Sequence, residues 1–206
     1  MGASAPDIDP EALITRHYPC GNPVRELLLR HGELVARKAI DILHRADWLD
    51  ADRDFTVQAA FLHDIGIGRT HCPELGCRGV LPYVCHGFEG RKLLDPLGLK
   101  RHGLVCERHV GVGLSADGIR RRGLPLPLRD MLPLSLEERL ICYADKFYSK
   151  TDNGRREKAI DDIIAGLIRH DEDYGRRFMI LHRFFTQAPP HPSNDAAAPL
   201  TSGMKP

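Results

Sequence analysis

The sequence predicts an all-α fold, a bundle of helices with a polar cluster in its core. Apolar residues recur at helical spacing in segment after segment, and residues that favour helix starts and stops stand at the ends of these segments. No stretch of useful length alternates apolar and polar residues as a strand does, and no internal repeat is present. These patterns indicate helices packed on helices without a sheet.

Six helices are expected in order along the chain. The first opens with Asn22 as the N-cap and Pro23 as the first helical residue, and it carries an amphipathic apolar stripe. The fifth is marked by Ser135 with Glu138, the signature of a capping box. The expected helices span about residues 22–46, 54–64, 82–95, 99–111, 135–148 and 156–185.

Three segments lie outside these helices. The glycine-containing loop 68–81 follows the second helix and is expected at the rim of a site, and 116–133 is rich in proline, leucine and arginine. The composition of 187–206 cannot bury enough apolar surface to become ordered, so a disordered tail is predicted. The chain is thus divided into an N-terminal segment 1–21, one domain 22–186 and the tail 187–206.

Length and composition indicate one globular domain. With 206 residues, of which 42% are hydrophobic, the chain can bury a core without disulfides, and its six cysteines are expected to remain thiols. A net charge of +1 provides no overall field for nucleic acid or membrane, so no nucleic acid polymer is expected as a partner. The chain has no membrane-length apolar run and no signal peptide, which predicts a cytoplasmic location. Homo-oligomerisation stays open.

Six polar residues interrupt the apolar faces of the expected helices. They are His31, His63, Asp64, His86, His109 and Asp145. One histidine on an apolar face is ordinarily a hydrogen-bonded core residue. Unpaired buried polar groups cost about 1–3 kcal/mol each, however, so six of them need a shared partner, and one or two metal ions would satisfy them. His102, seven residues before His109, is the reserve candidate.

Five short motifs carry these residues in order. They read HGELVARKA, FLHDIG, CHGFEG, ERHVG and YADKFYSK and fall within about residues 22–150. This series resembles the HD superfamily of metal-dependent phosphohydrolases, specifically its HDIG subgroup. The resemblance implies an HD-domain helical bundle with the metal site in the core between the helices.

The resemblance also implies two sets of metal ligands. One ion is held by His31, His63, Asp64 and Asp145. A second ion is completed by His86 and His109, with Asp64 bridging the two. Mixed imidazole and carboxylate ligands suit Fe or Mn, which are preferred, and also Zn, Co or Ni.

The activity that the resemblance implies is hydrolysis of a phosphoester or phosphoanhydride bond in a nucleotide-like small molecule. A metal-activated hydroxide would attack phosphorus, with Asp64 as the catalytic residue that orients it. Arg69, Lys146 and Lys150 are candidates for binding the phosphorylated substrate, although surface solvation explains each equally well. Ile67 stands where many HDIG proteins acting on cyclic dinucleotides have lysine, so the role of that lysine is either missing or moved to Arg69. The sequence also lacks the Gly-Tyr-Pro signature of the cyclic dinucleotide group, so that substrate is disfavoured.

Two alternatives remain open. The same six ligands occur in mixed-valence di-iron oxygenases of the superfamily, and the sequence separates these poorly from hydrolases. A noncatalytic binding module would be expected to have lost a ligand, and none is lost. Tyr143 and Tyr148, which flank Asp145, are candidates for stacking on a base, with core packing as the ordinary explanation for at least one.

Overall fold

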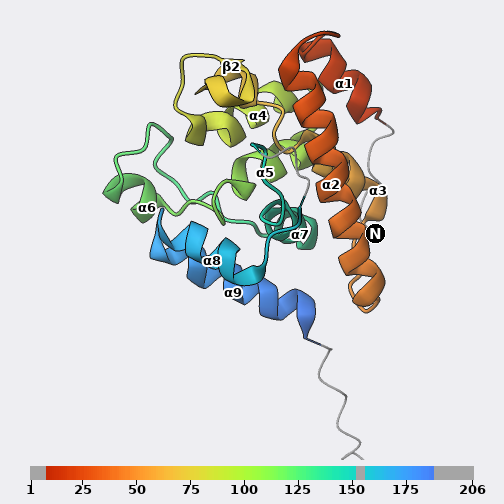
Figure 1. Ribbon diagram of the computed structural model, residues 1–206, viewed down its shortest axis with the longest axis vertical. Coiled ribbons are helices and arrows are strands. Elements are labelled where there is room, and N and C mark those ends of the chain that lie inside the picture. Colours follow the sequence, from red (N-terminus) through yellow and green to blue (C-terminus); the bar gives the residue numbers. More distant parts are fainter. Residues whose placement is uncertain (1–7, 152–155, 188–206) are drawn as a thin grey trace, which may run out of the picture.

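The computed structural model describes residues 8–151 and 156–187, and the regular secondary structure in these ranges is almost entirely helical (Figure 1). The α-helices are α1 (Pro10–His17), α2 (Pro23–Arg45), α3 (Arg53–Leu62), α4 (His86–Leu94), α5 (Lys100–His109), α6 (Ala116–Arg121), α7 (Leu136–Asp145), α8 (Ile160–Ile168) and α9 (Glu172–Thr186). Short 3-10 turns are η1 (Ile67–Arg69), η2 (Pro73–Leu75), η3 (Tyr83–Cys85) and η4 (Asp95–Leu97). The all-α prediction is confirmed for this part of the chain, and none of its helices has the length and apolarity that crossing a membrane requires.

The expected cap residues begin their helices. The Asn22 side chain accepts a hydrogen bond of 3.0 Å from the backbone N–H of Val24, with Pro23 directly after the cap. Ser135 Oγ accepts from the N–H of Glu138 at 3.1 Å. Each bond satisfies one of the amide groups that have no partner in the first helical turn, which is why these positions begin helices.

Two short helices were not expected from the sequence. Helix α1 follows Asp9, whose carboxylate accepts from the N–H groups of Glu11 and Ala12 at 2.9 and 3.0 Å. Helix α6 follows Ser115, whose hydroxyl accepts from the N–H of Gly118 at 3.1 Å. With 8 and 6 residues, they are too short to display a helical apolar stripe.

The single helix expected over 156–185 is wrong, because the structure has two helices there. Asp171 lies between α8 and α9 with an extended backbone (φ −167°, ψ 130°), and its carboxylate accepts from the N–H of Asp173 at 3.0 Å. Aspartate competes with the backbone inside a helix and favours the cap position. The break lets α8 fold back and pack against α9.

A small hairpin forms within the expected loop 68–81. Strands β1 (His71–Cys72) and β2 (Cys77–Arg78) pair antiparallel, with Cys72 opposite Cys77. Strands of two residues are too short for an alternating pattern in the sequence to reveal them. Of the predicted tail, residues 188–206 lie outside the described residues.

Two apolar clusters form the core, and the polar residues lie where they meet. The larger contains residues of α2, α3, α5, α7, α8 and α9, including Ala60. The smaller contains residues of α1, the start of α2 and the hairpin, including Leu62. His63 and Asp64 follow directly after these residues, so the chain places them at the boundary between the two clusters.

A buried carboxylate ties the segment after α6 to this core. Glu107 is 1% exposed. Arg91 Nη1 lies 2.6 Å from one of its oxygens, and the Arg129 guanidinium contacts both. Because a buried carboxylate needs such paired donors, the three side chains fix the loop around Arg129 against α4 and α5.

Candidate metal centre

The ends of helices bring the six polar residues together. Asp64 follows the end of α3 by two residues, His86 begins α4, His109 ends α5 and Asp145 ends α7, whereas His31 lies within α2. His63 completes the set, and each of the six residues is at most 6% exposed.

The six residues form two groups that share Asp64. His31, His63, Asp64 and Asp145 form one group, and Asp64, His86 and His109 form the other, with the potential ligand atoms of each group within 4.8 Å of one another. Asp64 Oδ2 lies 3.2 Å from His63 Nε2, whereas Oδ1 lies 3.3 Å from both His86 Nε2 and His109 Nε2. The two oxygens of one carboxylate therefore face two different sites.

Three histidines are oriented by the same backbone contact. The Nδ1 atoms of His63, His86 and His109 lie 2.6, 2.6 and 2.7 Å from the carbonyl oxygen of the residue three positions earlier. A carbonyl only accepts, so each Nδ1 carries a proton, and when the ring is neutral its Nε2 presents a lone pair to the cluster. Metal-binding histidines are held in this way. His31 differs, since its Nε2 lies 2.8 Å from Asp145 Oδ1.

The unsatisfied atoms of the cluster fit a metal cation. Within the described residues, His63 Nε2 and Asp64 Oδ1 are buried without a hydrogen-bond partner, whereas Asp64 Oδ2 is paired with Lys150 Nζ at 2.8 Å. His86 Nε2 and His109 Nε2 lie 3.1 Å apart, and both point lone pairs at the same space. Leaving such groups buried costs about 1–3 kcal/mol each. A shared electrophile removes this cost, so the donor set matches one or two transition-metal ions.

Burial and charge set the protonation of the cluster. Burial lowers the pKa of His31 to about 4 and that of His109 to about 3, so both are neutral at pH 7. Burial also acts to lower the pKa of His63, but the carboxylates of Asp64 and Asp145 outweigh it and raise that pKa to about 9. Against their own burial, both carboxylates have pKa values well below the usual range, because His63 and nearby lysines favour their charged forms.

Metal affinity is expected to rise with pH up to about 9. Below that pH His63 holds a proton in the metal-free protein, and an incoming ion must displace it. The dissociation constant for zinc should therefore fall about tenfold per pH unit between pH 7 and 9 and then level off. Competition titrations against a chromophoric chelator, corrected for the chelator's own protonation, measure this slope. A flat profile would contradict the assignment of His63.

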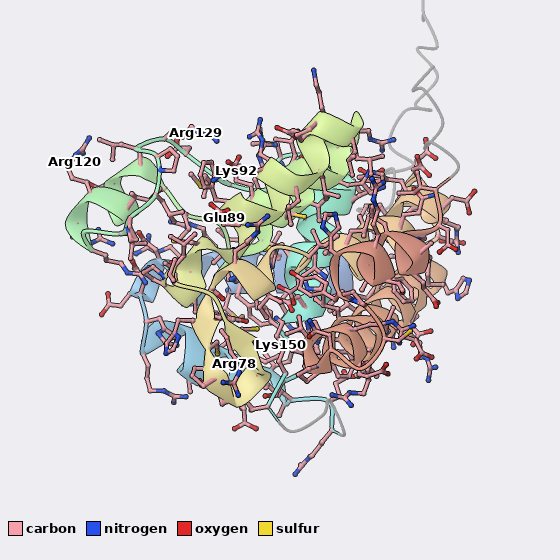
Figure 2. The ribbon with its side chains drawn as sticks, turned by 90° about the horizontal axis from the view of Figure 1, so that it is seen from above. Arg78, Glu89, Lys92, Arg120, Arg129 and Lys150 are labelled. Atoms are coloured by element: carbon pink, nitrogen blue, oxygen red, sulfur yellow. The ribbon has the colours of Figure 1, made fainter. Side chains whose placement is uncertain are left out.

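Two of the three predicted substrate-binding residues lie at the cluster. Lys146 Nζ lies 2.5 Å from Asp145 Oδ2 and 3.1 Å from the carbonyl oxygen of His109. Lys150 Nζ lies 2.8 Å from Asp64 Oδ2, and Figure 2 shows Lys150 beside the β1–β2 hairpin. Arg69 is exposed and lies near Tyr18, whose pKa its charge affects. The structure thus brings the two lysines to the cluster, whereas no hydrogen bond or ion pair joins Arg69 to it within the described residues.

Tyr18 holds the turn that carries His63 and Asp64, and the sequence did not reveal this role. Its hydroxyl donates to the carbonyl oxygen of Ile65 at 2.6 Å and accepts from the N–H of Gly68 at 3.1 Å. Tyr18 lies in the segment 1–21 that was placed before the domain. In the sequence, Tyr18 is only a tyrosine that follows a short capped helix. No local pattern connects such a residue to a turn about fifty positions later in the chain.

A cavity of about 610 Å³ opens beside Asp145, between the end of α7 and helix α8; we call it the Asp145 cavity. Four cationic side chains and two aromatic rings contribute to its lining: Lys146, Lys150, Lys158, Arg169, Tyr83 and Tyr148. Its volume is within the range of small-ligand sites. The cluster therefore borders an accessible, cation-rich space. Lys158 and Arg169 were not identified from the sequence, because exposed lysine and arginine residues carry no local signature of a site.

The other candidates lie elsewhere. His102, the reserve ligand, packs on Phe55 with ring centroids 4.7 Å apart and faces Gln58 Oε1 at 3.1 Å, outside both metal groups. Tyr143 stacks on Phe178 in the core, at 5.3 Å between centroids. Arg120 of α6 and Arg129 of the loop after it lie on the opposite side of Figure 2 from α1 and α2.

Comparison with known proteins finds relatives among archaeal proteins. The uncharacterized protein MJ0778 of Methanocaldococcus jannaschii is 31% identical over 146 residues, which are 70% of this chain and 75% of that protein. Two tRNA (cytidine(56)-2′-O)-methyltransferases match at lower identity. The enzyme of Picrophilus torridus is 29% identical over 125 residues (60% of this chain), and that of Thermoplasma volcanium is 24% identical over 163 residues (78% of this chain). This chain spans only 32% and 42% of these two enzymes. No family model and no solved structure matches the chain.

These relatives overturn the predicted activity. Proteins named as tRNA methyltransferases are transferases, so the prediction of a hydrolase of phosphoester or phosphoanhydride bonds is wrong, as is the oxygenase alternative. The expected small phosphorylated substrate and the exclusion of nucleic acid polymers are wrong for the same reason. Metal ligands alone do not define a reaction. Net charge is a sum over the whole surface, and it does not report a local group of cations such as that in the Asp145 cavity.

Proposed function

This chain belongs to the family of the M. jannaschii protein MJ0778, and we propose that it acts on tRNA as a metal-binding helical domain in ribose 2′-O-methylation. The single observation that supports metal binding is the presence of two groups of potential ligands that share Asp64. The names of the two methyltransferase relatives support tRNA as the partner. Because this chain spans under half of each named enzyme, its part in tRNA methylation would be the metal-binding one.

The ligands proposed are the six predicted ones, and their order along the chain supports an HD-type domain. His31, His63 and Asp145 would hold one ion with Asp64, and His86 and His109 would complete a second site. A divalent ion in this position supplies a Lewis acid for an anionic phosphate oxygen or a ribose hydroxyl. Fe or Mn remain the preferred ions, with Zn, Co or Ni as alternatives.

The chain's own residues prepare the site for an anionic partner. Lys146 donates to Asp145 and to the carbonyl oxygen of His109, so it fixes the carboxylate of α7 relative to the end of α5. Against its burial, Asp145 and Asp64 raise the pKa of Lys150 well above its usual value, so this side chain stays charged. Both ammonium groups line the Asp145 cavity, where an RNA phosphate would meet them.

Purified full-length protein tests this proposal in two steps. Elemental analysis without added metal should find one or two transition-metal ions per chain. Fluorescence anisotropy with a labelled tRNA transcript should then show binding about tenfold tighter than to a DNA duplex of equal charge, because the ribose hydroxyls distinguish the two. Protein that carries no metal, or that binds the DNA as tightly as the tRNA, would contradict the proposal.

A further inference from the structure

We propose that the Asp145 cavity takes one unpaired nucleotide of RNA, with Lys158 and Arg169 binding its phosphates and Tyr148 stacking on its base. This inference rests on the proposed function, from which it takes RNA as the partner. The volume of about 610 Å³ suits one nucleotide and excludes a base-paired helix. Specific recognition of RNA commonly uses such unpaired nucleotides, whose bases are free to stack on aromatic side chains.

Charge in the Asp145 cavity is divided between engaged and available cations. Lys146 and Lys150 contact the carboxylates of Asp145 and Asp64, so much of their charge is compensated. Lys158 and Arg169 form no ion pair within residues 8–151 and 156–187, and both are exposed. Besides Asp145, the described lining contains one carboxylate, Asp162. The two available cations thus leave the outer part of the cavity positive and suited to phosphate.

The backbone holds these two cations on different segments that line the cavity. The N–H of Lys158 donates to the carbonyl oxygen of Phe147 at 2.8 Å, which fixes the residue beside the end of α7. Arg169 is the C-cap of α8, one turn from Gly166, which also lines the cavity. A phosphate in the cavity would meet one cation from the segment after α7 and one from the end of α8.

Gly166 keeps the space in front of α8 open. Glycine inside a helix costs roughly 1 kcal/mol relative to alanine, so its presence in the middle of α8 needs a reason. A Cβ at this position would meet only the Arg169 Nη2 atom, at 3.6 Å, within the described residues. A small side chain would therefore fit without strain, whereas a large one would project into the cavity beside the guanidinium.

Tyr148 has the position and the freedom to stack on a base. Its hydroxyl donates to Glu157 Oε2 at 3.2 Å, which holds one edge of the ring. No other aromatic ring among the described residues packs against it, whereas Tyr83, which also lines the cavity, packs on His86 at 4.6 Å between centroids. A base stacked on such a ring typically contributes about 1–3 kcal/mol.

Anisotropy titrations of metal-loaded full-length protein with a labelled single-stranded RNA test the proposal. Lys158→Ala and Arg169→Ala should each weaken binding about five- to tenfold at low salt and reduce the slope of log affinity against log salt by roughly 0.7. Gly166→Leu should weaken binding similarly with unchanged metal content. Ala165→Leu, which introduces leucine at an exposed neighbouring position of α8, and Arg176→Ala on α9 are the matched controls.

The outcomes separate this inference from the proposed function. If wild-type protein retains metal and binds tRNA but all three cavity variants bind RNA as wild type does, the cavity proposal fails and the proposed function stands. If wild-type protein binds no RNA, both fail. Equal affinity for paired RNA of the same length, or for free adenosine monophosphate, would overturn the assignment to an unpaired RNA nucleotide. Because the two alanine variants change exposed residues, the test does not depend on the folding of Gly166→Leu.

Discussion

Asp64→Asn is expected to remove metal from both sites at once. Asp64 is the one residue common to the two donor groups, with one oxygen facing each. The substitution keeps the size of the side chain but replaces a charged, shared oxygen donor with an amide whose NH₂ group repels a cation. Elemental analysis and zinc titration should show metal content falling from one or two ions per chain to about one tenth of that or less.

Asp54→Asn is the matched control, because it makes the same chemical change at an exposed position of α3. It should retain the full metal content. His86→Ala separates the two sites, since it removes a donor from the second group only and should leave the first ion in place. Full metal content in Asp64→Asn would show that Asp64 does not bridge the two groups.

Gly66→Ala is expected to destabilise the fold and weaken the second metal site. The backbone angles of Gly66 (φ −81°, ψ −3°) suit any residue, so glycine is needed here because a larger side chain has no room. A Cβ would lie 2.2 Å from both the N atom of Gly90 and the carbonyl oxygen of His86, which are backbone atoms of α4. Helix α4 would have to move away from the turn, at a cost of about 3 kcal/mol in the free energy of unfolding.

Urea unfolding in the presence of a chelator measures this loss without the contribution of bound metal. Since His86 begins α4, displacement of the helix should also reduce the metal content of the second site. Gly166→Ala is the control, because its Cβ meets only a guanidinium nitrogen at 3.6 Å, and it should stabilise the protein by about 0.5–1 kcal/mol. Equal stability of Gly66→Ala and wild type would show that α4 does not need this close approach.

The parts of the fold that the sequence predicted well depend on local chemistry. Caps such as Asn22 and Ser135 act within three residues, so they mark helix starts without any tertiary information. The six polar residues were visible because each stands on an apolar face. The break at Asp171 was missed because its cap interrupts a pattern that otherwise continues through both α8 and α9.

The parts that were missed depend on residues distant in sequence. Tyr18 and the turn from Ile65 to Gly68 meet through two hydrogen bonds that only the packing of α1 creates. Lys158 and Arg169 face one cavity because α8 folds back from α9. Activity was mispredicted for a related reason: donor groups for a metal are conspicuous in a sequence, whereas the surface that selects a substrate is made of ordinary exposed residues.

The most direct test of the central claim is a titration of tRNA against metal-loaded and chelator-treated full-length protein. Bound divalent ions would compensate the charge of Asp145, which lines the Asp145 cavity, and of Asp64 in the same donor group, and make the cavity more attractive to phosphate. We expect tRNA affinity to fall about tenfold after chelation, to recover when metal is restored, and to be insensitive to metal in Asp64→Asn. Equal tRNA affinity with and without metal in the wild-type protein would contradict a metal centre that serves tRNA.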